Sequence, residues 1–322
     1  MSNNQLKQIF FPLLAAASSF SLILAFSAKG ELTQQASKLL GKPPAPQPVQ
    51  NSDAKPNGKL VAQKDQAFRN AIAKLEQEVK ENRLTFNIPK QFKSQVLEEV
   101  KLNNSEKVVA LTFDDGPWPD NTTQILDVLR ENNVKATFFV VGQAVQAFPQ
   151  LLQQVVKEGH AIGNHTWSHS YHNFSPEGAK NEIERTAAIV YETTGVKTSL
   201  FRPPGGFMHN GVVDYAKQRD YAIVMWSADS NDYRRPPVPT FLHSVLSSTG
   251  PGGIILMHDG GGDRSQTVKA LPELIADLKQ QGYRFVTVAE LLKMREKENQ
   301  TTTATQPPNA DANSQAKISQ KN

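Results

Sequence analysis

The 322-residue chain contains no cysteine. This absence excludes disulfide bonds, thiolate metal ligands, a cysteine nucleophile and lipid attachment through an N-terminal cysteine. It leaves the redox compartment of the protein undecided, so the compartment has to be argued from other features.

The chain also lacks a block of like charges. Its 35 Lys and Arg residues and 31 Asp and Glu residues are spread along the sequence and leave a net charge of only +4. No basic patch suited to nucleic acid is present, so we expect no nucleic-acid partner.

Long apolar stretches are almost absent. The exception is residues 9–26, which follow Lys7 near the N-terminus and are mostly apolar. Such a segment directs export, which predicts a periplasmic or extracellular protein. Ala25 and Ser27 offer a signal-peptidase site, and an 18-residue stretch is short for a membrane span. A cleaved signal peptide and a retained anchor formed by residues 9–26 both stay open, with the anchor favoured.

The composition divides the chain into five parts. Residues 1–29 form the signal peptide or membrane anchor, and the Pro-rich residues 30–62 form a linker. Residues 63–104 form a helical lead-in, because apolar side chains recur at helical spacing in its first half. Residues 105–296 form the catalytic domain. Residues 297–322 lack apolar periodicity, which predicts a disordered tail.

Within the catalytic domain, short apolar runs alternate with amphipathic stretches. Strands are predicted at 108–113, 136–141, 161–163, 201–203, 222–227, 254–258 and 284–287. Helices are predicted at 122–132, 148–158, 176–194, 210–219, 240–248, 267–281 and 288–295. This alternation predicts an α/β fold, a distorted (β/α) barrel of about seven parallel strands that is closed or nearly closed. Active sites of such barrels lie at the C-terminal ends of the strands.

Two adjacent carboxylates and a pair of histidines mark the most informative positions. Asp114 and Asp115 end the apolar run 108–113, where buried charges are costly unless a cation or partner satisfies them. His165 and His169 follow with the i, i+4 spacing of a helix face. The set predicts a metal site with one carboxylate to spare.

Five motifs appear in order along the chain: Thr-Phe-Asp-Asp-Gly-Pro at 112–117, His-Thr-Trp-Ser-His at 165–169, Arg-Pro-Pro-Gly-Gly at 202–206, Asp-Ser-Asn-Asp-Tyr at 229–233 and Leu-Met-His-Asp at 256–259. Over residues 108–292 the chain resembles the polysaccharide deacetylases of carbohydrate esterase family 4. Each motif alone is weak, but five in this order are specific.

The resemblance implies that Asp115, His165 and His169 bind one divalent metal ion, Zn²⁺ first and Co²⁺, Mn²⁺ or Ni²⁺ as alternatives. Two imidazoles and one carboxylate leave positions open for water and substrate, as in catalytic sites. The resemblance makes Asp114 the general base and His258 the catalytic acid.

Two further polar residues complete the implied site. Arg202 resembles the arginine that holds the base, and Asp232 resembles the aspartate that orients the acid. Such partners separate the pKa values of base and acid.

The substrate-binding residues implied by the resemblance are Gly205, Tyr233 and Leu256. Gly205 stands where the family usually has an aromatic residue and Tyr233 where it usually has tryptophan. If residue 205 acts through its backbone N–H, glycine keeps the donor but loses an aromatic wall of the groove.

The tryptophans divide between two environments. Trp118 and Trp167 are candidates for stacking on sugar rings, because each lies next to a predicted metal-site motif. Trp226 is expected in the core.

The leading hypothesis is therefore an exported, metal-dependent hydrolase that removes N-acetyl groups from N-acetylglucosamine residues of peptidoglycan, a chitin-like chain or an exopolysaccharide. The alternatives are an O-acetyl esterase acting on xylan and a non-catalytic, membrane-tethered glycan-binding module. We expect an acetylated polysaccharide as partner and a monomeric protein.

Overall fold

The computed structural model describes residues 70, 85–86, 88–104 and 106–305. The predicted signal or anchor, the Pro-rich linker and most of the tail lie outside these residues. In the described part of the chain, no helix is both long and apolar enough to cross a bilayer.

A nine-stranded sheet forms the centre of the domain, and all its strand pairings are parallel. Its path runs β2-β8-β7-β5-β4-β3-β10-β9, with β11 also paired to β3. The strands are β2 (Val96–Leu97), β3 (Val108–Asp114), β4 (Thr137–Val140), β5 (Ala161–Asn164), β7 (Leu200–Phe201), β8 (Ala222–Val224), β9 (Ala228–Asp229), β10 (Gly253–His258) and β11 (Arg284–Phe285). A separate parallel pair joins β1 (Thr85–Phe86) to β6 (Lys197–Thr198).

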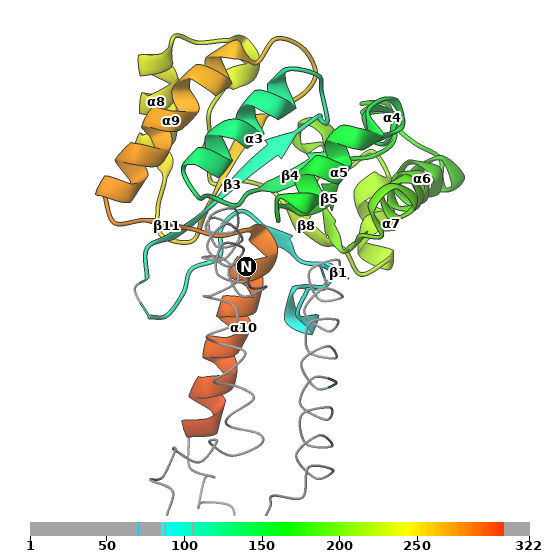
Figure 1. The fold of residues 1–322 in the computed structure, drawn as a ribbon. Helices are drawn as coiled ribbons and strands as arrows, with labels where there is room; N and C mark the ends of the chain where they lie inside the picture. Colours follow the sequence, from blue (N-terminus) through cyan, green and yellow to red (C-terminus); the bar gives the residue numbers. More distant parts are fainter. Residues whose placement is uncertain (1–69, 71–84, 87, 105, 306–322) are drawn as a thin grey trace, which may run out of the picture. The chain divides into compact units, whose positions relative to one another are not determined.

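Helices surround the curled sheet (Figure 1). They are α3 (Asn121–Glu131), α4 (Gly142–Ala147), α5 (Pro149–Lys157), α6 (Pro176–Thr194), α7 (Val212–Gln218), α8 (Val238–Ser248), α9 (Ser265–Gln280) and α10 (Val288–Thr305), with short 3-10 turns η1 (Lys90–Phe92), η2 (Pro204–Gly206) and η3 (Asp232–Arg234). The prediction of a distorted (β/α) barrel is confirmed as a half-barrel. Within the described residues no pairing joins β2 to β9, so the barrel is not closed there.

Helix α6 shows why the predicted boundaries were accurate where capping signals are strong. The Ser175 side chain accepts a hydrogen bond from the Gly178 N–H at 3.1 Å, and Pro176 occupies the first turn. Gly195 ends the helix in the left-handed conformation. Serine, proline and glycine at these positions are the preferred start and stop residues of helices.

The two faces of β3 pack in different core clusters, and the face toward α10 changes from apolar to polar along the strand. Val108 and Ala110 pack with Leu291 and Leu292 of α10 in one core cluster, while Leu111 and the other odd-numbered residues of β3 belong to the opposite one. Thr112 and Asp114 continue the face of Val108 and Ala110, because strand residues alternate with period two. The N-terminal half of this face is thus plugged by α10, and its C-terminal half carries polar groups.

The helix predicted in the first half of the lead-in, residues 63–104, lies outside the described residues apart from residue 70, and the described second half contains no α-helix. This part contains β1, η1 and β2, and β2 adds a strand to the main sheet beside β8. Two-residue strands carry too short a pattern to be recognised in sequence.

The disordered tail was predicted to begin at residue 297, but α10 continues to Thr305. The predicted start of the tail is therefore wrong. Glu298 accepts hydrogen bonds from the backbone N–H groups of Asn103 and Asn104 at 2.8 and 3.1 Å. Polar side chains, not apolar periodicity, therefore attach this part of the helix to the domain.

Candidate active site

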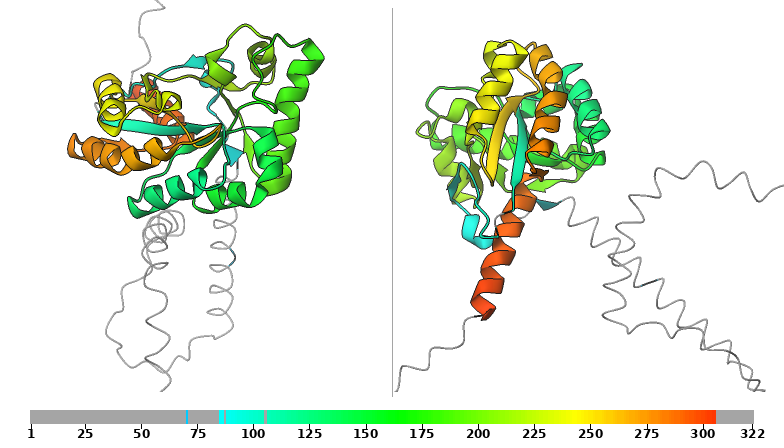
Figure 2. Two further views of the ribbon diagram at one scale, coloured as in Figure 1. Left: turned by 90° about the horizontal axis from the view of Figure 1, so that it is seen from above. Right: turned by 90° about the vertical axis from the view of Figure 1, so that its left-hand side faces the viewer.

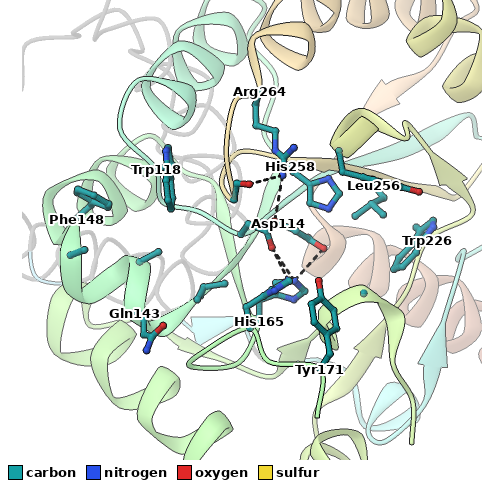
Figure 3. Close-up of a pocket in the computed structure, with 18 of the residues that line it drawn as sticks. Asp114, Trp118, Gln143, Phe148, His165, Tyr171, Trp226, Leu256, His258 and Arg264 are labelled. Carbon is teal, nitrogen blue, oxygen red and sulfur yellow. Dashed lines mark hydrogen bonds and ion pairs between the residues drawn. The ribbon is translucent and has the colours of Figure 1, made fainter. Parts of the chain in front are cut away.

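A pocket of about 770 Å³ opens at the C-terminal ends of the strands (Figure 3). Its lining includes eight of the ten site residues predicted from the sequence: Asp114, Asp115, His165, His169, Gly205, Tyr233, Leu256 and His258. The other two, Arg202 and Asp232, lie behind the pocket and bind Asp114 and His258.

Arg202 fixes Asp114 from the interior of the sheet. Its side chain is fully buried, and its guanidinium donates to Asp114 Oδ1 and Thr112 Oγ1 at 2.8 Å each and to the carbonyls of Val224 and Met225 at 2.9 Å each. A buried charge is tolerated when it is paired and fully hydrogen-bonded. The network holds one oxygen of Asp114 in place and leaves Oδ2 free.

Asp115, His165 and His169 form a three-residue cluster whose ligand atoms lie within 4.8 Å of one another. His165 Nδ1 lies 2.7 Å from the carbonyl oxygen of Arg202, so it carries the proton and Nε2 presents a lone pair. That Nε2 lies 3.5 Å from Asp115 Oδ1, and His169 Nε2 lies 3.0 Å from the same oxygen.

The donor set fits a divalent cation. Asp115 Oδ1 is buried and accepts no hydrogen bond in good geometry from the described residues. An oxygen and an imidazole lone pair that face each other repel unless a cation lies between them, and two imidazoles with one carboxylate are a common catalytic ligand set.

Electrostatics keep the carboxylate of this cluster ionised. Burial alone would raise the pKa of Asp115, but the close approach of the two imidazoles outweighs it and holds that pKa well below its usual range. Burial lowers the pKa of His169, whereas the close approach and negative charge of Asp115 raise it above the ordinary value overall.

The two histidines do not lie on a helix, which corrects the i, i+4 helical interpretation. Residues 165–169 form a loop after β5, and Thr166 and His169 have φ angles of 68° and 54°. Glu182 of α6 stabilises this loop by accepting the N–H groups of Trp167 and Ser168 at 2.9 Å each. Hydrogen bonds from another element, α6, and not helical periodicity, shape the loop that brings the imidazoles together.

His258 and Asp232 form the second proton-transfer pair. His258 Nδ1 donates to Asp232 Oδ1 at 2.6 Å, while Asp232 Oδ2 accepts the His258 N–H at 2.8 Å and the Thr267 hydroxyl at 2.7 Å. Register pairing of His258 with Asp114 across β10 and β3 places the two at the same height in the sheet. His258 Nε2 is left to face the pocket.

Asp232 also sets the protonation of His258. Burial alone would lower the pKa of His258, but the bond to Asp232 and its charge, together with Asp114 and Asp115, raise that pKa to about 9. Because the folded-state value exceeds the ordinary 6.5, the charged form contributes stability below pH ~6.5 that is lost as pH rises through about 9.

We predict that Asp232→Asn moves the alkaline limb of the pH–rate profile to lower pH. The amide removes the charge that raises the pKa of His258, so the acid form is lost earlier as pH rises. Initial rates from pH 6 to 10 measure the shift. Asp229→Asn is the matched control, since Asp229 also lines the pocket but accepts its hydrogen bond from the Asn231 N–H and not from His258. An unchanged limb in Asp232→Asn contradicts the assignment.

The tryptophans are arranged differently from the prediction. Trp118 is exposed and lines the pocket, in agreement with a sugar-binding role. Trp167 is buried with the Arg185 guanidinium 3.8 Å from its ring centroid, so it is not free to stack on a sugar. Trp226, expected in the core, is half-buried and lines the pocket.

Two polar residues near Asp115 and Gly116, Arg264 and Asp259, were not predicted from the sequence as part of the site. Arg264 is buried at the pocket wall, with Nη2 3.8 Å from Asp115 Oδ2. Asp259 accepts the Gly116 N–H at 3.1 Å and the Thr122 hydroxyl at 2.6 Å, and burial raises its pKa to about 7. Asp259 is the last residue of the fifth motif, and Arg264 lies outside every motif.

Comparison with known proteins agrees with this geometry. The polysaccharide deacetylase family model matches residues 101–224. A peptidoglycan-N-acetylglucosamine deacetylase of Bacillus cereus is 47% identical over 195 residues, covering 60% of this chain and 91% of that protein. A chitooligosaccharide deacetylase of Sinorhizobium fredii is 37% identical over 54% of this chain and 87% of its own. The crystal structure of the Bc1960 peptidoglycan N-acetylglucosamine deacetylase matches with a TM-score of 0.59 and 35% identity, over 63% of this chain and 94% of that one. This chain therefore belongs to the polysaccharide deacetylase family.

Proposed function

We propose that this protein is an exported, metal-dependent hydrolase that removes N-acetyl groups from N-acetylglucosamine residues of a polysaccharide, with peptidoglycan first among the substrates. The observation that carries the proposal is one pocket in which a carboxylate held by Arg202 and an imidazole held by Asp232 border a three-residue ligand cluster. The similarity to peptidoglycan and chitooligosaccharide deacetylases supports the substrate class.

Asp115, His165 and His169 are the residues that would hold the cation, and Zn²⁺ suits two imidazoles and one carboxylate. When bound, the cation supplies Lewis-acid polarisation of the acetyl carbonyl and lowers the pKa of a water molecule. Co²⁺, Mn²⁺ and Ni²⁺ bind similar ligand sets and remain the alternatives within this proposal.

Asp114 acts as the general base. Arg202 occupies its Oδ1, whereas Oδ2 lies 3.7 Å from His165 Nε2 and so faces the ligand cluster. This free oxygen is placed to accept the proton of the attacking water. Fixing one oxygen of the base reduces the motion needed at the moment of proton transfer.

His258 acts as the general acid. With its pKa raised to about 9, the imidazole is protonated near neutral pH, and Nε2 faces the pocket. It can therefore give a proton to the leaving amine, without which the sugar nitrogen would depart as an unstable anion. Tyr233 and Leu256 border the acid, and the Tyr233 ring lies edge-on to His258 with centroids 5.9 Å apart.

The cellular arrangement follows from the chain outside the described residues. Residues 1–29 act as signal or anchor, and the Pro-rich residues 30–62 connect them to the catalytic domain. An extracytoplasmic location suits a polymer of the cell envelope. We propose that the protein works there as a monomer.

The test is acetate release by the purified chain from peptidoglycan glycan strands, N-acetylglucosamine oligomers and acetylated xylan. We expect release from the two N-acetylated substrates, because the buried Asp232 keeps His258 charged for amide cleavage. Release from acetylated xylan alone would instead indicate an O-acetyl esterase, whose leaving group needs the acid less. Absence of release from all three, with metal bound, would indicate a glycan-binding module.

A further inference from the structure

Gly205 contributes no side chain to the pocket wall, and the space beside it is occupied by the ring of Tyr171. Its φ angle is 57°, and a Cβ added to it would lie 2.8 Å from Tyr171 Cε1 and 3.2 Å from Phe207 Cδ2. A side chain at position 205 would therefore compete with the Tyr171 ring for the same space. The wall at this point is built from the loop that follows His169, not from the segment of Arg202.

Tyr171 is held in place from two sides. Its ring stands edge-on to the His169 ring, with centroids 5.2 Å apart and an interplanar angle of 86°, and it packs against Phe207 with centroids 5.4 Å apart. Figure 3 shows its hydroxyl directed into the pocket. Despite these contacts, 52% of the residue is exposed. One face of a fixed aromatic ring is thus offered to the pocket.

Exposed aromatic side chains gather around this opening. Among the described residues, the exposed large apolar side chains include Trp118, Tyr171, Phe207 and Tyr233, and of these four only Phe207 does not line the pocket itself, although it packs on Tyr171. Exposing aromatic surface to water is unfavourable unless a ligand covers it. Tyrosine suits a sugar, because its ring covers the apolar face of a pyranose while its hydroxyl stays in polar surroundings.

We infer that Tyr171 is a specificity-determining residue that supports the glycan chain at the position that Gly205 leaves open. Its ring packs against a sugar of an N-acetylglucosamine polymer beside the metal-ligand loop. The inference rests on the proposed function and adds to it a residue that binds the glycan chain beside the metal-ligand cluster.

The first experiment compares Tyr171→Ala with Tyr171→Phe on an N-acetylglucosamine hexamer. Losing the ring is expected to raise KM about tenfold, the size of effect that about 1.4 kcal/mol of aromatic contact gives, with kcat changed less than threefold. Tyr171→Phe keeps the ring and should remain within about threefold of the wild type. Tyr191→Ala is the matched control, because Tyr191 is 51% exposed on α6 and does not line the pocket.

Metal content separates this role from a structural one. Tyr171 touches His169, so elemental analysis of each variant shows whether the ligand loop is intact. An unchanged KM in Tyr171→Ala overturns the inference, and so does a fall in kcat accompanied by loss of metal. A Tyr171→Phe variant as impaired as Tyr171→Ala would also overturn it, because the ring would then not be the binding element.

A reciprocal exchange tests the shared space directly. Gly205→Tyr should raise KM, since residue 205 has a φ of 57° and its Cβ meets Tyr171 and Phe207. Adding Tyr171→Ala to Gly205→Tyr keeps the backbone strain but removes the contact with Tyr171, so the double variant should bind the hexamer better than Gly205→Tyr alone. A double variant that binds no better than Gly205→Tyr contradicts the inference.

Calorimetric binding of the hexamer distinguishes a failed inference from a failed function. Weaker binding by Tyr171→Ala supports the inference even if the wild type releases no acetate. Equal binding by both proteins, or no binding by the wild type, overturns it.

Discussion

Exhaustive dialysis against a chelator is expected to abolish acetate release, and adding back Zn²⁺ is expected to restore it. Asp115, His165 and His169 bring two imidazole nitrogens and one carboxylate oxygen together in a pocket that is open to solvent. A site with three protein ligands and open positions exchanges its metal readily enough for a chelator to compete. Elemental analysis before and after dialysis, with activity measured on the same samples, checks the expectation.

His169→Ala supplies the genetic form of the same test. The variant should lose both metal and activity, because His169 Nε2 lies 3.0 Å from Asp115 Oδ1 within the cluster. His172→Ala is the matched control, since His172 lies three residues further along the same loop, is exposed and stands outside the cluster. Full activity in protein shown to be metal-free would refute the metal dependence.

Replacing His258 with alanine is expected to slow amide hydrolysis about 10²- to 10⁴-fold, the usual contribution of a positioned proton donor. The leaving amine needs that proton, whereas the phenolate of an activated phenyl acetate does not. The same variant should therefore lose much less activity on the ester. Rates on an N-acetylglucosamine oligomer and on the phenyl ester, measured with one enzyme preparation, give the ratio.

Asp114→Asn provides the contrasting variant, because a base that activates water is needed for both substrates. It should lose activity on amide and ester alike while metal stays bound, since Asp114 is not among the three ligands. His243→Ala, an exposed histidine of α8, controls for the substitution itself. Equal loss on amide and ester in His258→Ala would show that His258 is not the acid, and loss of metal in Asp114→Asn would show that Asp114 is a ligand.

Strand β3 and the charged residue at its end could be predicted, because a run of apolar residues indicates a buried strand and a carboxylate at its end indicates a functional site. All seven residues of β3 are buried, and the apolar run ends on Asp114 as the sequence pattern indicates. The parallel βα alternation then places Asp114 and His258 at the same end of neighbouring strands. Helix α6 was equally accessible, since Ser175 and Gly195 mark its two ends.

The features that the sequence did not reveal depend on tertiary contacts. The loop 165–169 takes its shape from Glu182, thirteen residues after His169 and on a different element, so the helical spacing of its histidines was misleading. The environment of Trp167 depends on Arg185, which no local pattern connects with it. The Arg264 guanidinium lies near Asp115 because Gly260 and Gly261 have no side chains, which lets their segment approach the backbone and side chain of Asp115 closely.

Helix α10 packs at the N-terminal end of the sheet, so the two ends of the domain differ. Ile88 and Phe92 pack in the same cluster as the start of α10, and Figures 1 and 2 show α10 projecting from this end. The pocket opens at the opposite end of the strands. A polymer can thus cross the mouth of the pocket without meeting α10, so shortening the projecting end of this helix should leave turnover on a soluble oligomer unchanged.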